Sequence, residues 1–230
     1  MINGKSILAI IPARGGSKGV SRKNIRNVAG KPLLAWTIVE ATKSKYIDRV
    51  ILSSEDSEII RVAEEWGCEV PFVRPIELAQ DDTPGIEPVI HAIQSLQDYD
   101  YVVLLQPTSP LRTYTDIDAC LELCIKSQSS SCVSVTEPDK SPYWMFKLTS
   151  DKKLRPLIES GELACRRQDL QKVYAVNGAV YVSDCTYLLK EKSLIGNDTI
   201  AYEMPRERSL DIDTEFDLKI CEIIMREMGK

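Results

Sequence analysis

Residues 7–24, ILAIIPARGGSKGVSRKN, join an apolar run to a basic, glycine-rich loop. The apolar run predicts a buried strand, so we expect the loop at the carboxyl end of that strand. Glycines there allow left-handed backbone and a close approach to a ligand, and basic side chains supply fixed positive charge, which together suit a polyphosphate. The glycines are Gly15, Gly16 and Gly19, and the basic residues are Arg14, Lys18 and Lys23.

The spacing within this loop excludes the two commonest phosphate-binding loops. A P-loop needs a glycine, four further residues and then Gly-Lys followed by Ser or Thr, and a dinucleotide fingerprint needs G-x-G-x-x-G. Neither pattern occurs here. The loop is therefore predicted to bind a polyphosphate without belonging to either of these two large families.

Strand-like apolar runs alternate with helical segments along most of the chain, which predicts an α/β fold with a mostly parallel sheet. The runs are 7–11, 50–52, 70–73, 101–105, 131–135 and 179–182, and the helical segments are 32–41, 57–66, 87–96, 115–127 and 210–228. This alternation stops over about 138–172, where prolines, aromatic residues and charges predict an insertion. Its aromatic residues indicate a contact either with another subunit or with its own domain.

The composition fits one domain over residues 1–230 that carries this insertion. With 43% hydrophobic and 27% charged residues, the chain is typical of soluble globular proteins, and it shows neither a membrane span nor a secretion signal. A net charge of -5 argues against general binding of nucleic acid, so the basic loop is expected to serve a small anionic ligand. Because the sequence shows neither a membrane span nor a secretion signal, we expect a cytoplasmic protein.

The cysteines and the single histidine exclude other classes of site. Seven cysteines without any C-x-x-C pair, in a chain that shows no secretion signal, are expected to be reduced and mostly buried. Cys120 and Cys124 stand four apart on an expected helix, but the chain offers no convincing ligand set that would complete a zinc site. One histidine also leaves little room for a hydrolase triad.

Polar side chains stand at the ends of several expected strands, where open α/β sheets bind their ligands. Gln106 begins a proline-rich turn, so its amide either faces a ligand or caps the turn. Arg74 ends the expected third strand and serves either a nucleotide or a structural ion pair. Arg166 and Arg167 lie in the insertion and suit either a carboxylate ligand or an ordinary solvated surface.

Asp211 and Asp213 precede the last expected helix. If this segment is extended, both carboxylates point to one side and can share a hard divalent cation, of which Mg²⁺ is the natural candidate beside phosphates. A D-x-D pair alone is more often a solvated or helix-capping pair. Its combination with a polyphosphate loop favours the metal, which would neutralise charge during an in-line displacement.

Blocks of sequence spread along nearly the whole chain resemble one family, the acylneuraminate cytidylyltransferases or CMP-sialic acid synthetases. This family includes the CMP-legionaminic and CMP-pseudaminic acid synthetases. The blocks are ARGGSKG (13–19), KN (23–24), GKPL (30–33), RP (74–75) with ELA (77–79), QPTSPLR (106–112), NGAVY (177–181) and SLDIDT (209–214). The CMP-Kdo synthetases have Ser-Thr-Arg in place of Gly-Ser-Lys in the first block, so they look like more distant cousins.

The resemblance implies a Rossmann-like nucleotidyltransferase sheet flanked by helices and a defined reaction. The anomeric hydroxyl of a nine-carbon 2-keto sugar acid attacks the α-phosphate of CTP, which gives the CMP-sugar and pyrophosphate with Mg²⁺ as cofactor. The family's insertion crosses to a partner subunit, so residues 138–172 would form a homodimer whose active sites share residues. Neither a nucleic acid nor a membrane is an expected partner.

The resemblance also assigns roles to single residues. Nucleotide-binding positions are Arg14, Gly15, Gly16, Ser17, Lys18, Lys23, Asn24 and Arg74. Sugar-facing positions are Gln106, Arg167, Asn177 and Tyr181. The metal pair is Asp211 and Asp213, and the catalytic residues are Arg14, Lys18 and Asp211, of which Asp211 also assists deprotonation of the attacking hydroxyl.

Three questions remain open at the level of sequence. Leu194-Ile195 and residues 82–85 depart from the pattern of some sialic-acid enzymes, so a sialic-type sugar is favoured only slightly over legionaminic or pseudaminic acid. Related sheets use UTP or GTP, which leaves another nucleotide as an alternative. A catalytically silent nucleotide-binding protein with the same fold is the alternative from another class.

Overall fold

The computed structural model describes residues 2–96, 98–158, 166 and 170–229. Six strands form one sheet in the order β10-β6-β9-β5-β1-β4. They are β1 (Ile7–Pro12), β4 (Arg49–Ser53), β5 (Tyr101–Leu104), β6 (Ser131–Thr136), β9 (Ala175–Asp184) and β10 (Ile200–Glu203). The helices are α1 (Leu33–Thr42), α2 (Ser57–Glu65), α3 (Glu87–Leu96), α4 (Tyr114–Lys126), α5 (Cys185–Glu191) and α6 (Glu215–Glu227).

The sheet is mostly parallel, as the alternation of strands and helices predicts. Five strands run in one direction, and β9 runs antiparallel to both of its neighbours, β5 and β6. Because the chain passes from β1 to β4 on one side and then returns to place β5 on the other side, the order reverses at β1. Open α/β sheets bind ligands at such a reversal, beyond the carboxyl ends of the strands.

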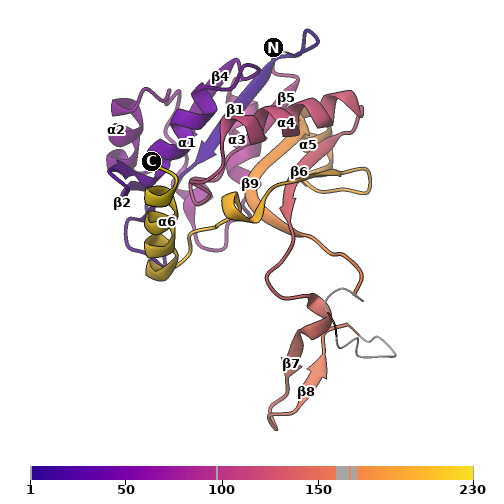
Figure 1. Cartoon of the computed structure of the whole chain (residues 1–230). Coiled ribbons are helices and arrows are strands. Elements are labelled where there is room, and N and C mark those ends of the chain that lie inside the picture. The colour runs from indigo at the N-terminus through magenta and orange to yellow at the C-terminus, as the bar shows by residue number, and fades with distance from the viewer. Residues whose placement is uncertain (1, 97, 159–165, 167–169, 230) are drawn as a thin grey trace.

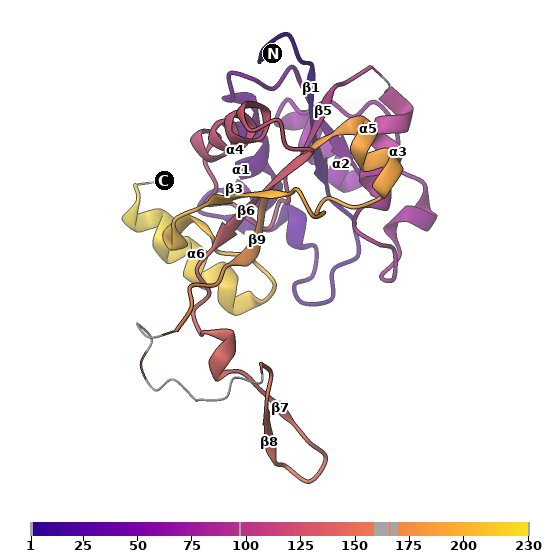
Figure 2. The ribbon, with the colours of Figure 1, turned by 90° about the vertical axis from the view of Figure 1, so that its right-hand side faces the viewer.

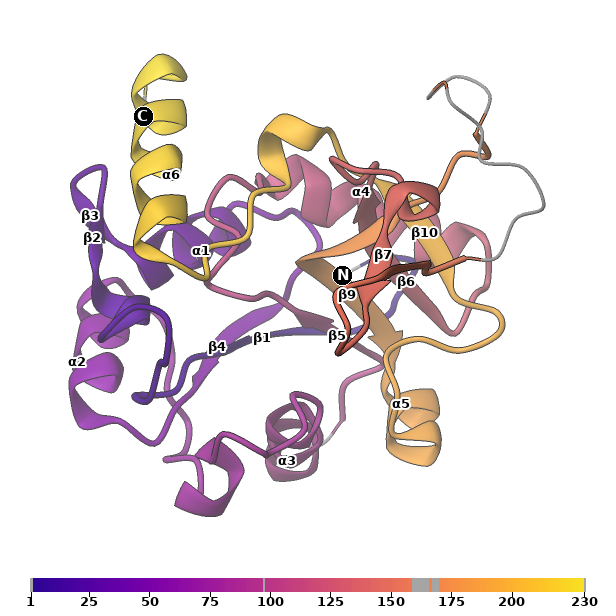
Figure 3. The same cartoon turned by 90° about the horizontal axis from the view of Figure 1, so that it is seen from below.

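Helices cover both faces of the sheet, as Figure 3 shows. Alternate residues of β1 point to opposite faces, so Ile7, Ala9 and Ile11 pack with α1, α2 and α4, whereas Leu8 and Ile10 pack with α3 and α5. These residues are fully buried. The strictly apolar β1 therefore lies between two hydrophobic layers at the centre of the molecule, and the loop that follows it is held by both.

A third hydrophobic cluster fixes the C-terminal helix next to the first loop. Leu218 and Met225 of α6 pack with Val20 and Trp36 and with Ile212, which lies just before the helix. The small hairpin of β2 (Asn27–Val28) and β3 (Lys31–Pro32) completes this cluster. The segment that carries Asp211 and Asp213 is thus anchored beside the glycine-rich loop.

Three expected elements differ from the structure. No strand forms over 70–73, which the structure describes throughout, because Pro71 has no N–H for a ladder; only Glu69 bridges Ile51. The last helix begins at Glu215 and not near 210, because Thr214 and Asp217 form a capping box that starts the helix there. The late strand is also longer than the expected 179–182, since β9 begins at Ala175.

Between β6 and β9 the chain leaves the sheet and projects away from it (Figures 1 and 2). This excursion carries the hairpin of β7 (Phe146–Leu148) and β8 (Leu154–Pro156), whose residues are exposed. The expected insertion at 138–172 covers this hairpin, and part of that range lies outside the described residues.

The remaining expectations from composition concern the cysteines and the membrane. The six described cysteines are buried and unbridged, as expected, and Cys165 lies outside the described residues. No helix in the described part of the chain has the length and apolar character that crossing a bilayer requires.

Candidate active site

A pocket of about 290 Å³ opens at the carboxyl ends of β1 and β5, where the strand order reverses. It brings together nine of the residues expected from the sequence to form the site. These are Arg14, Gly16, Ser17, Lys23, Asn24, Arg74, Gln106, Asp211 and Asp213. Residues from four distant parts of the chain therefore line one pocket.

Two glycines of the loop, Gly15 and Gly19, serve close packing and not left-handed backbone. A Cβ atom on Gly15 would collide with the carboxylate of Asp56, and one on Gly19 would collide with the main-chain oxygen of Asp213. Neither glycine has a positive φ, so the expectation of left-handed backbone at these positions is wrong. The left-handed residue of the loop is Arg22, with φ 55°, whose guanidinium binds Asp56 at 2.5 and 2.9 Å.

Arg14 and Lys18 share one acidic partner, Asp81. Arg14 Nη2 lies 2.9 Å from one carboxylate oxygen of Asp81, and Lys18 Nζ lies 2.9 Å from the other. Arg14 also donates to the main-chain oxygen of Gln80 at 2.9 Å. Arg14 lines the pocket, and the same carboxylate holds Lys18 beside it.

Lys23 connects the loop to the C-terminal segment. Its ammonium donates to the main-chain oxygen of Ile212 at 2.7 Å and lies 3.1 Å from the carboxylate of Asp213. Asn24 is buried and donates from its amide to the main-chain oxygen of Arg14 at 3.0 Å, which fixes the start of the loop. Both residues line the pocket.

Arg74 is buried, with 3% of its side chain exposed, and forms an ion pair with Glu55 at 2.5 Å. The other oxygen of Glu55 accepts the main-chain N–H of Gly15 at 2.6 Å. The sequence left open whether Arg74 serves a nucleotide or a structural ion pair. The structure shows the ion pair, and Arg74 also lines the pocket. The Nε atom of Arg74 is buried without a hydrogen-bond partner, so one donor remains for a ligand.

Asp211 and Asp213 flank a buried residue, Ile212, whose N–H donates to the main-chain oxygen of Thr108 at 2.9 Å. Both carboxylates line the pocket. Partial desolvation by the surrounding protein raises the pKa of Asp211, and the negative charge of Asp213 raises it further, although hydrogen bonding to Thr108 and the charge of Lys23 oppose this. The two carboxylates therefore interact electrostatically, as expected for a pair on one side of an extended segment.

This donor set fits a hard cation. Carboxylate oxygens are the ligands that Mg²⁺ prefers, and a cation would relieve the repulsion between Asp211 and Asp213. Within the ranges that the structure describes, no group of three or more His, Cys, Asp and Glu side chains is arranged for a metal. Mg²⁺ commonly keeps several waters and takes phosphate oxygens from its substrate, so two carboxylates are a sufficient protein share.

Gln106 lines the pocket next to the positive-φ residue Gly178 of β9. A Cβ atom on Gly178 would stand only 2.6 Å from the side-chain oxygen of Gln106, so glycine makes room for the amide. The fully buried guanidinium of Arg112 holds the two elements together. It donates to the main-chain oxygens of Gln106 and Ala179 at 3.2 and 2.7 Å.

The other three residues expected to face the sugar do not line this pocket. Asn177 is buried, and its amide binds Ser134 at 2.6 Å and Ser209 at 2.9 Å. Tyr181 is half-buried; burial raises the pKa of its hydroxyl, and the charge of Asp211 adds to the increase. Arg167 lies outside the described residues. Their expected contacts with a sugar stay predictions.

Sequence reasoning missed the acidic residues that organise the basic loop. Glu55 follows β4 and Asp81 follows a short 3-10 helix, Ile76–Ala79, but neither lies near the loop in sequence. A polar residue directly after a strand is a weak signal for Glu55. No pattern in the sequence marks Asp81. Thr108 follows Gln106 in the proline-rich turn, and no pattern there indicates its contact with Ile212.

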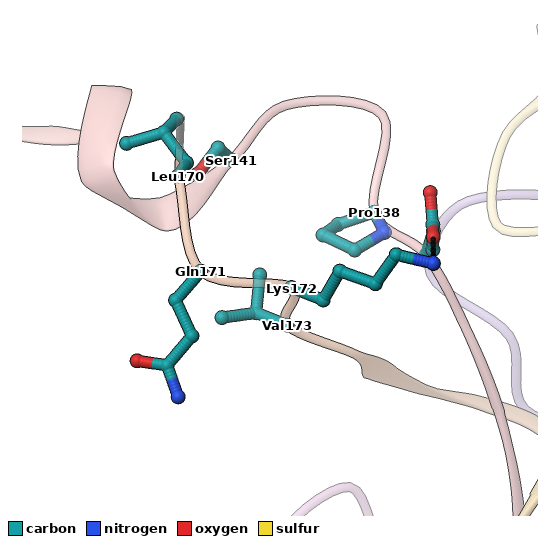
Figure 4. Close-up of a pocket in the computed structure, with 7 residues that line it drawn as sticks. Pro138, Ser141, Leu170, Gln171, Lys172 and Val173 are labelled. Carbon is teal, nitrogen blue, oxygen red and sulfur yellow. Dashed lines mark ion pairs between the residues drawn. The ribbon is translucent and has the colours of Figure 1, made fainter. Parts of the chain in front are cut away.

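Two other hollows border the insertion. One, shown in Figure 4, lies where the two ends of the insertion meet, and it is lined by Pro138, Ser141 and 170–173. Glu137 and Lys172 form an ion pair of 3.5 Å there. The second, of about 570 Å³, is lined by residues 136–139 at the start of the insertion and by Ile220 and Ile224 of α6, and it also includes Asp211. Asp211 is thus accessible from both the loop pocket and the insertion.

A Rossmann-like sheet with a basic glycine loop and a carboxylate pair at the strand reversal defines a nucleotidyltransferase. Residues 8–203 match the family model described as "Cytidylyltransferase". The chain belongs to this cytidylyltransferase family, and the resemblance drawn from its sequence blocks is confirmed.

Curated relatives carry three different sugar names at similar identity. The chain is 35% identical to the pseudaminic acid cytidylyltransferase of Campylobacter jejuni over 95% of this chain and 96% of that protein. It is 35% identical to the CMP-N,N'-diacetyllegionaminic acid synthase of Legionella pneumophila over 95% and 96%. It is 34% identical to the N-acylneuraminate cytidylyltransferase of Escherichia coli over 97% of this chain and 53% of that protein, so it spans about half of that relative.

Solved structures confirm the fold. A CMP:2-keto-3-deoxy-manno-octonic acid synthetase complexed with CTP superposes with a TM-score of 0.73 at 14% identity, covering 97% of this chain and 99% of that one. The 4-diphosphocytidyl-2C-methyl-D-erythritol synthase of Anaerococcus prevotii superposes with a TM-score of 0.68 at 15% identity, covering 97% and 100%. The expected Rossmann-like nucleotidyltransferase sheet is therefore confirmed.

Proposed function

We propose that the protein is a CMP-nonulosonic acid synthetase that transfers CMP from CTP to the anomeric hydroxyl of a sialic-type sugar acid. The observation that carries the proposal is the single pocket at the strand reversal, which unites the basic loop, Gln106 and the pair Asp211 and Asp213. Family membership and relatives named for acylneuraminate, pseudaminate and legionaminate support the same reaction.

In this reaction a bond forms between the anomeric oxygen and the α-phosphorus, and the bond from that phosphorus to the bridging oxygen breaks. Pyrophosphate leaves with the bridging oxygen, and the hydroxyl loses its proton. Arg14 and Lys18 stabilise the charge that accumulates on the leaving pyrophosphate. Asp211 lines the pocket and accepts the hydroxyl proton.

Asp211 and Asp213 would hold Mg²⁺, which when bound neutralises phosphate charge during the displacement. Arg14, Lys18 and Lys23 bind the triphosphate, while Gln106 and Arg167 orient the sugar acid. We also propose that the protein works as a homodimer, which the exposed apolar residues of the β7–β8 hairpin support, and that it acts in the cytoplasm, where CTP is available.

Pyrophosphate release tests the proposal. The purified protein is mixed with CTP, Mg²⁺ and each of three acids, N-acetylneuraminic, pseudaminic and legionaminic. We expect release with at least one of them, a preference for the sialic-type acid, and loss of release on addition of EDTA. Asp211→Ala is the control and should abolish release while the chain stays folded.

Two results would contradict parts of the proposal. Absence of turnover with all three acids would leave a nucleotide-binding protein without catalysis. A larger thermal stabilisation by UTP, GTP or ATP than by CTP, each with Mg²⁺, would overturn the choice of nucleotide, because only a bound ligand raises the melting temperature by mass action.

A further inference from the structure

Asp81 holds both of the loop cations that the proposed function assigns to the leaving pyrophosphate. Its two carboxylate oxygens lie 2.9 Å from Arg14 Nη2 and 2.9 Å from Lys18 Nζ. The spacing is that of an anion with two oxygens bound between two cations, which is also how neighbouring phosphate oxygens are bound. Without nucleotide, the position between these cations is already filled by a carboxylate of the chain.

The ion pairs around the pocket differ in how easily they separate. Arg74 and Glu55 are 3% and 10% exposed, so removal of either would leave a buried charge, and the pair is permanent. Asp81 and Lys18 are 52% and 76% exposed. Exposed pairs of this kind contribute little to stability, so a polyphosphate of higher charge can displace Asp81.

Asp81 is also an anion under ordinary conditions. Its hydrogen bond from Lys18, together with the nearby charge of Arg14, holds the pKa of Asp81 below its usual range. Asp81 follows the 3-10 helix Ile76–Ala79 in a turn of exposed residues, and Gln80 and Thr83 on either side of it line the pocket. The carboxylate can therefore turn toward solvent without disturbing a core.

We propose that Asp81 is a positioning residue that stands in for phosphate: it holds Arg14 and Lys18 in place, yields to the triphosphate, and competes with pyrophosphate after the reaction. The proposal rests on the proposed function only in that Arg14 and Lys18 bind the polyphosphate. Competition by Asp81 lowers the affinity for both CTP and pyrophosphate, and it thereby speeds the departure of the product.

The test compares Asp81→Asn with Asp82→Asn. Both changes remove one negative charge from adjacent exposed positions, but Asp82 makes no ion pair in the described part of the chain. Isothermal titration calorimetry with inorganic pyrophosphate, CTP and cytidine gives the dissociation constants. Asp81→Asn should bind pyrophosphate and CTP about fivefold more tightly, which corresponds to the loss of two weak pairs, whereas its affinity for uncharged cytidine should not change.

Each possible result decides between the explanations. Tighter binding of pyrophosphate by Asp81→Asn alone, accompanied by stronger product inhibition, supports the proposal. Unchanged or weaker binding would overturn it, and so would an equal gain in Asp82→Asn, which would show a general effect of charge. If the wild-type protein bound neither CTP nor pyrophosphate, the proposed function itself would fail and this role of Asp81 with it. Thermal unfolding of both variants confirms that each is folded.

Discussion

Arg14 and Arg74 lie on the same pocket in opposite electrostatic settings. Arg74 is buried against Glu55, and its charge is already compensated within the protein. Arg14 is 34% exposed, and its acidic partner Asp81 is more exposed still. Arg14 can therefore redirect its guanidinium toward charge that develops on a ligand, whereas Arg74 can offer only a hydrogen bond.

This difference gives a prediction for Arg14→Ala. We expect kcat to fall about 100-fold and the dissociation constant for CTP to rise less than about fivefold. The reason is that Arg14 stabilises the charge that develops in the transition state more than it stabilises bound CTP. Steady-state kinetics and calorimetry measure the two effects. Arg61→Ala is the control, because Arg61 is exposed on α2 and forms an ion pair with Glu65. Equal losses in kcat and CTP affinity would show that Arg14 only anchors the nucleotide.

At this scale the sequence predicts the ligand-facing side chains better than their partners. Arg14, Lys23 and Asp211 stand in short motifs whose chemistry is readable from neighbouring residues. Glu55 and Asp81 act through contacts between segments far apart in the chain, and no local pattern specifies such a contact. The left-handed φ falls on Arg22, because its ion pairs with Asp56 and Glu58 stabilise a conformation that glycine would adopt more readily.

Among the elements, the contact between the first loop and the segment before α6 is the tightest feature of the site. Gly19→Ala would push a methyl group into the main-chain oxygen of Asp213, whereas a methyl group on Gly16 would meet no protein atom within 4 Å. We expect Gly19→Ala to lower the free energy of unfolding by about 1 to 3 kcal/mol, as overpacked sites do, and Gly16→Ala to leave it nearly unchanged. Urea denaturation measures both. Equal stabilities would show that this contact is loose.

The N-terminus of α2 gives a prediction about acid stability. Asp56 caps this helix and binds Arg22, which lowers the pKa of Asp56 to about 2 against the opposing effect of burial. A carboxyl whose pKa is lower in the folded state than in the unfolded state stabilises the folded protein. This stabilisation is complete at pH values above the unfolded pKa, near 4, and it disappears as the pH falls toward the folded pKa of about 2. Asp56→Asn should therefore cost about 1 to 2 kcal/mol at pH near 7 and little at pH near 2.

Denaturation of Asp56→Asn at several pH values measures this effect. Glu58→Gln is the matched control, since Glu58 also pairs with Arg22 but is half exposed and caps no helix. A loss of stability in Asp56→Asn that is the same at both ends of the pH range would contradict the assignment.

Four of the five expected helices agree with the structure to within one residue at each end, because periodicity and capping residues are local, whereas the start of α6 differs and α5 was not expected. The strands are harder to predict from the sequence, because their pairing depends on distant parts of the chain. Pro71 removes the expected strand over 70–73, and the antiparallel direction of β9 is set by its pairing with β5 and β6, which no local pattern in β9 specifies. The start of α6 depends on the capping box at Thr214, which frees Asp211 and Asp213 for the pocket.

For the whole molecule, the projecting insertion is the feature that most needs a partner. Leu148 and Leu154 on the hairpin are 67% and 63% exposed. We expect the protein to have the mass of two chains by light scattering, and the pair of changes Leu148→Arg and Leu154→Arg to give a monomer, because charges cannot be buried in an apolar interface.

The control for this experiment lies on another surface. Ile223 on α6 is 61% exposed, so Ile223→Arg changes an equally exposed apolar residue outside the insertion. It should leave the mass unchanged. A wild-type protein that is already monomeric, or a dimer that survives both hairpin changes, would contradict the proposed role of the insertion.

The close contact between Gly19 and Asp213 and the hydrogen bond from Lys23 to the main-chain oxygen of Ile212 also have a consequence for synthesis of the protein. A ribosome produces the basic loop early and the acidic pair almost two hundred residues later. Until the later segment emerges, the nascent chain has cations but no site in which to use them. The pocket is therefore complete only after residues 211–213 have been synthesised and the central sheet has formed around β1.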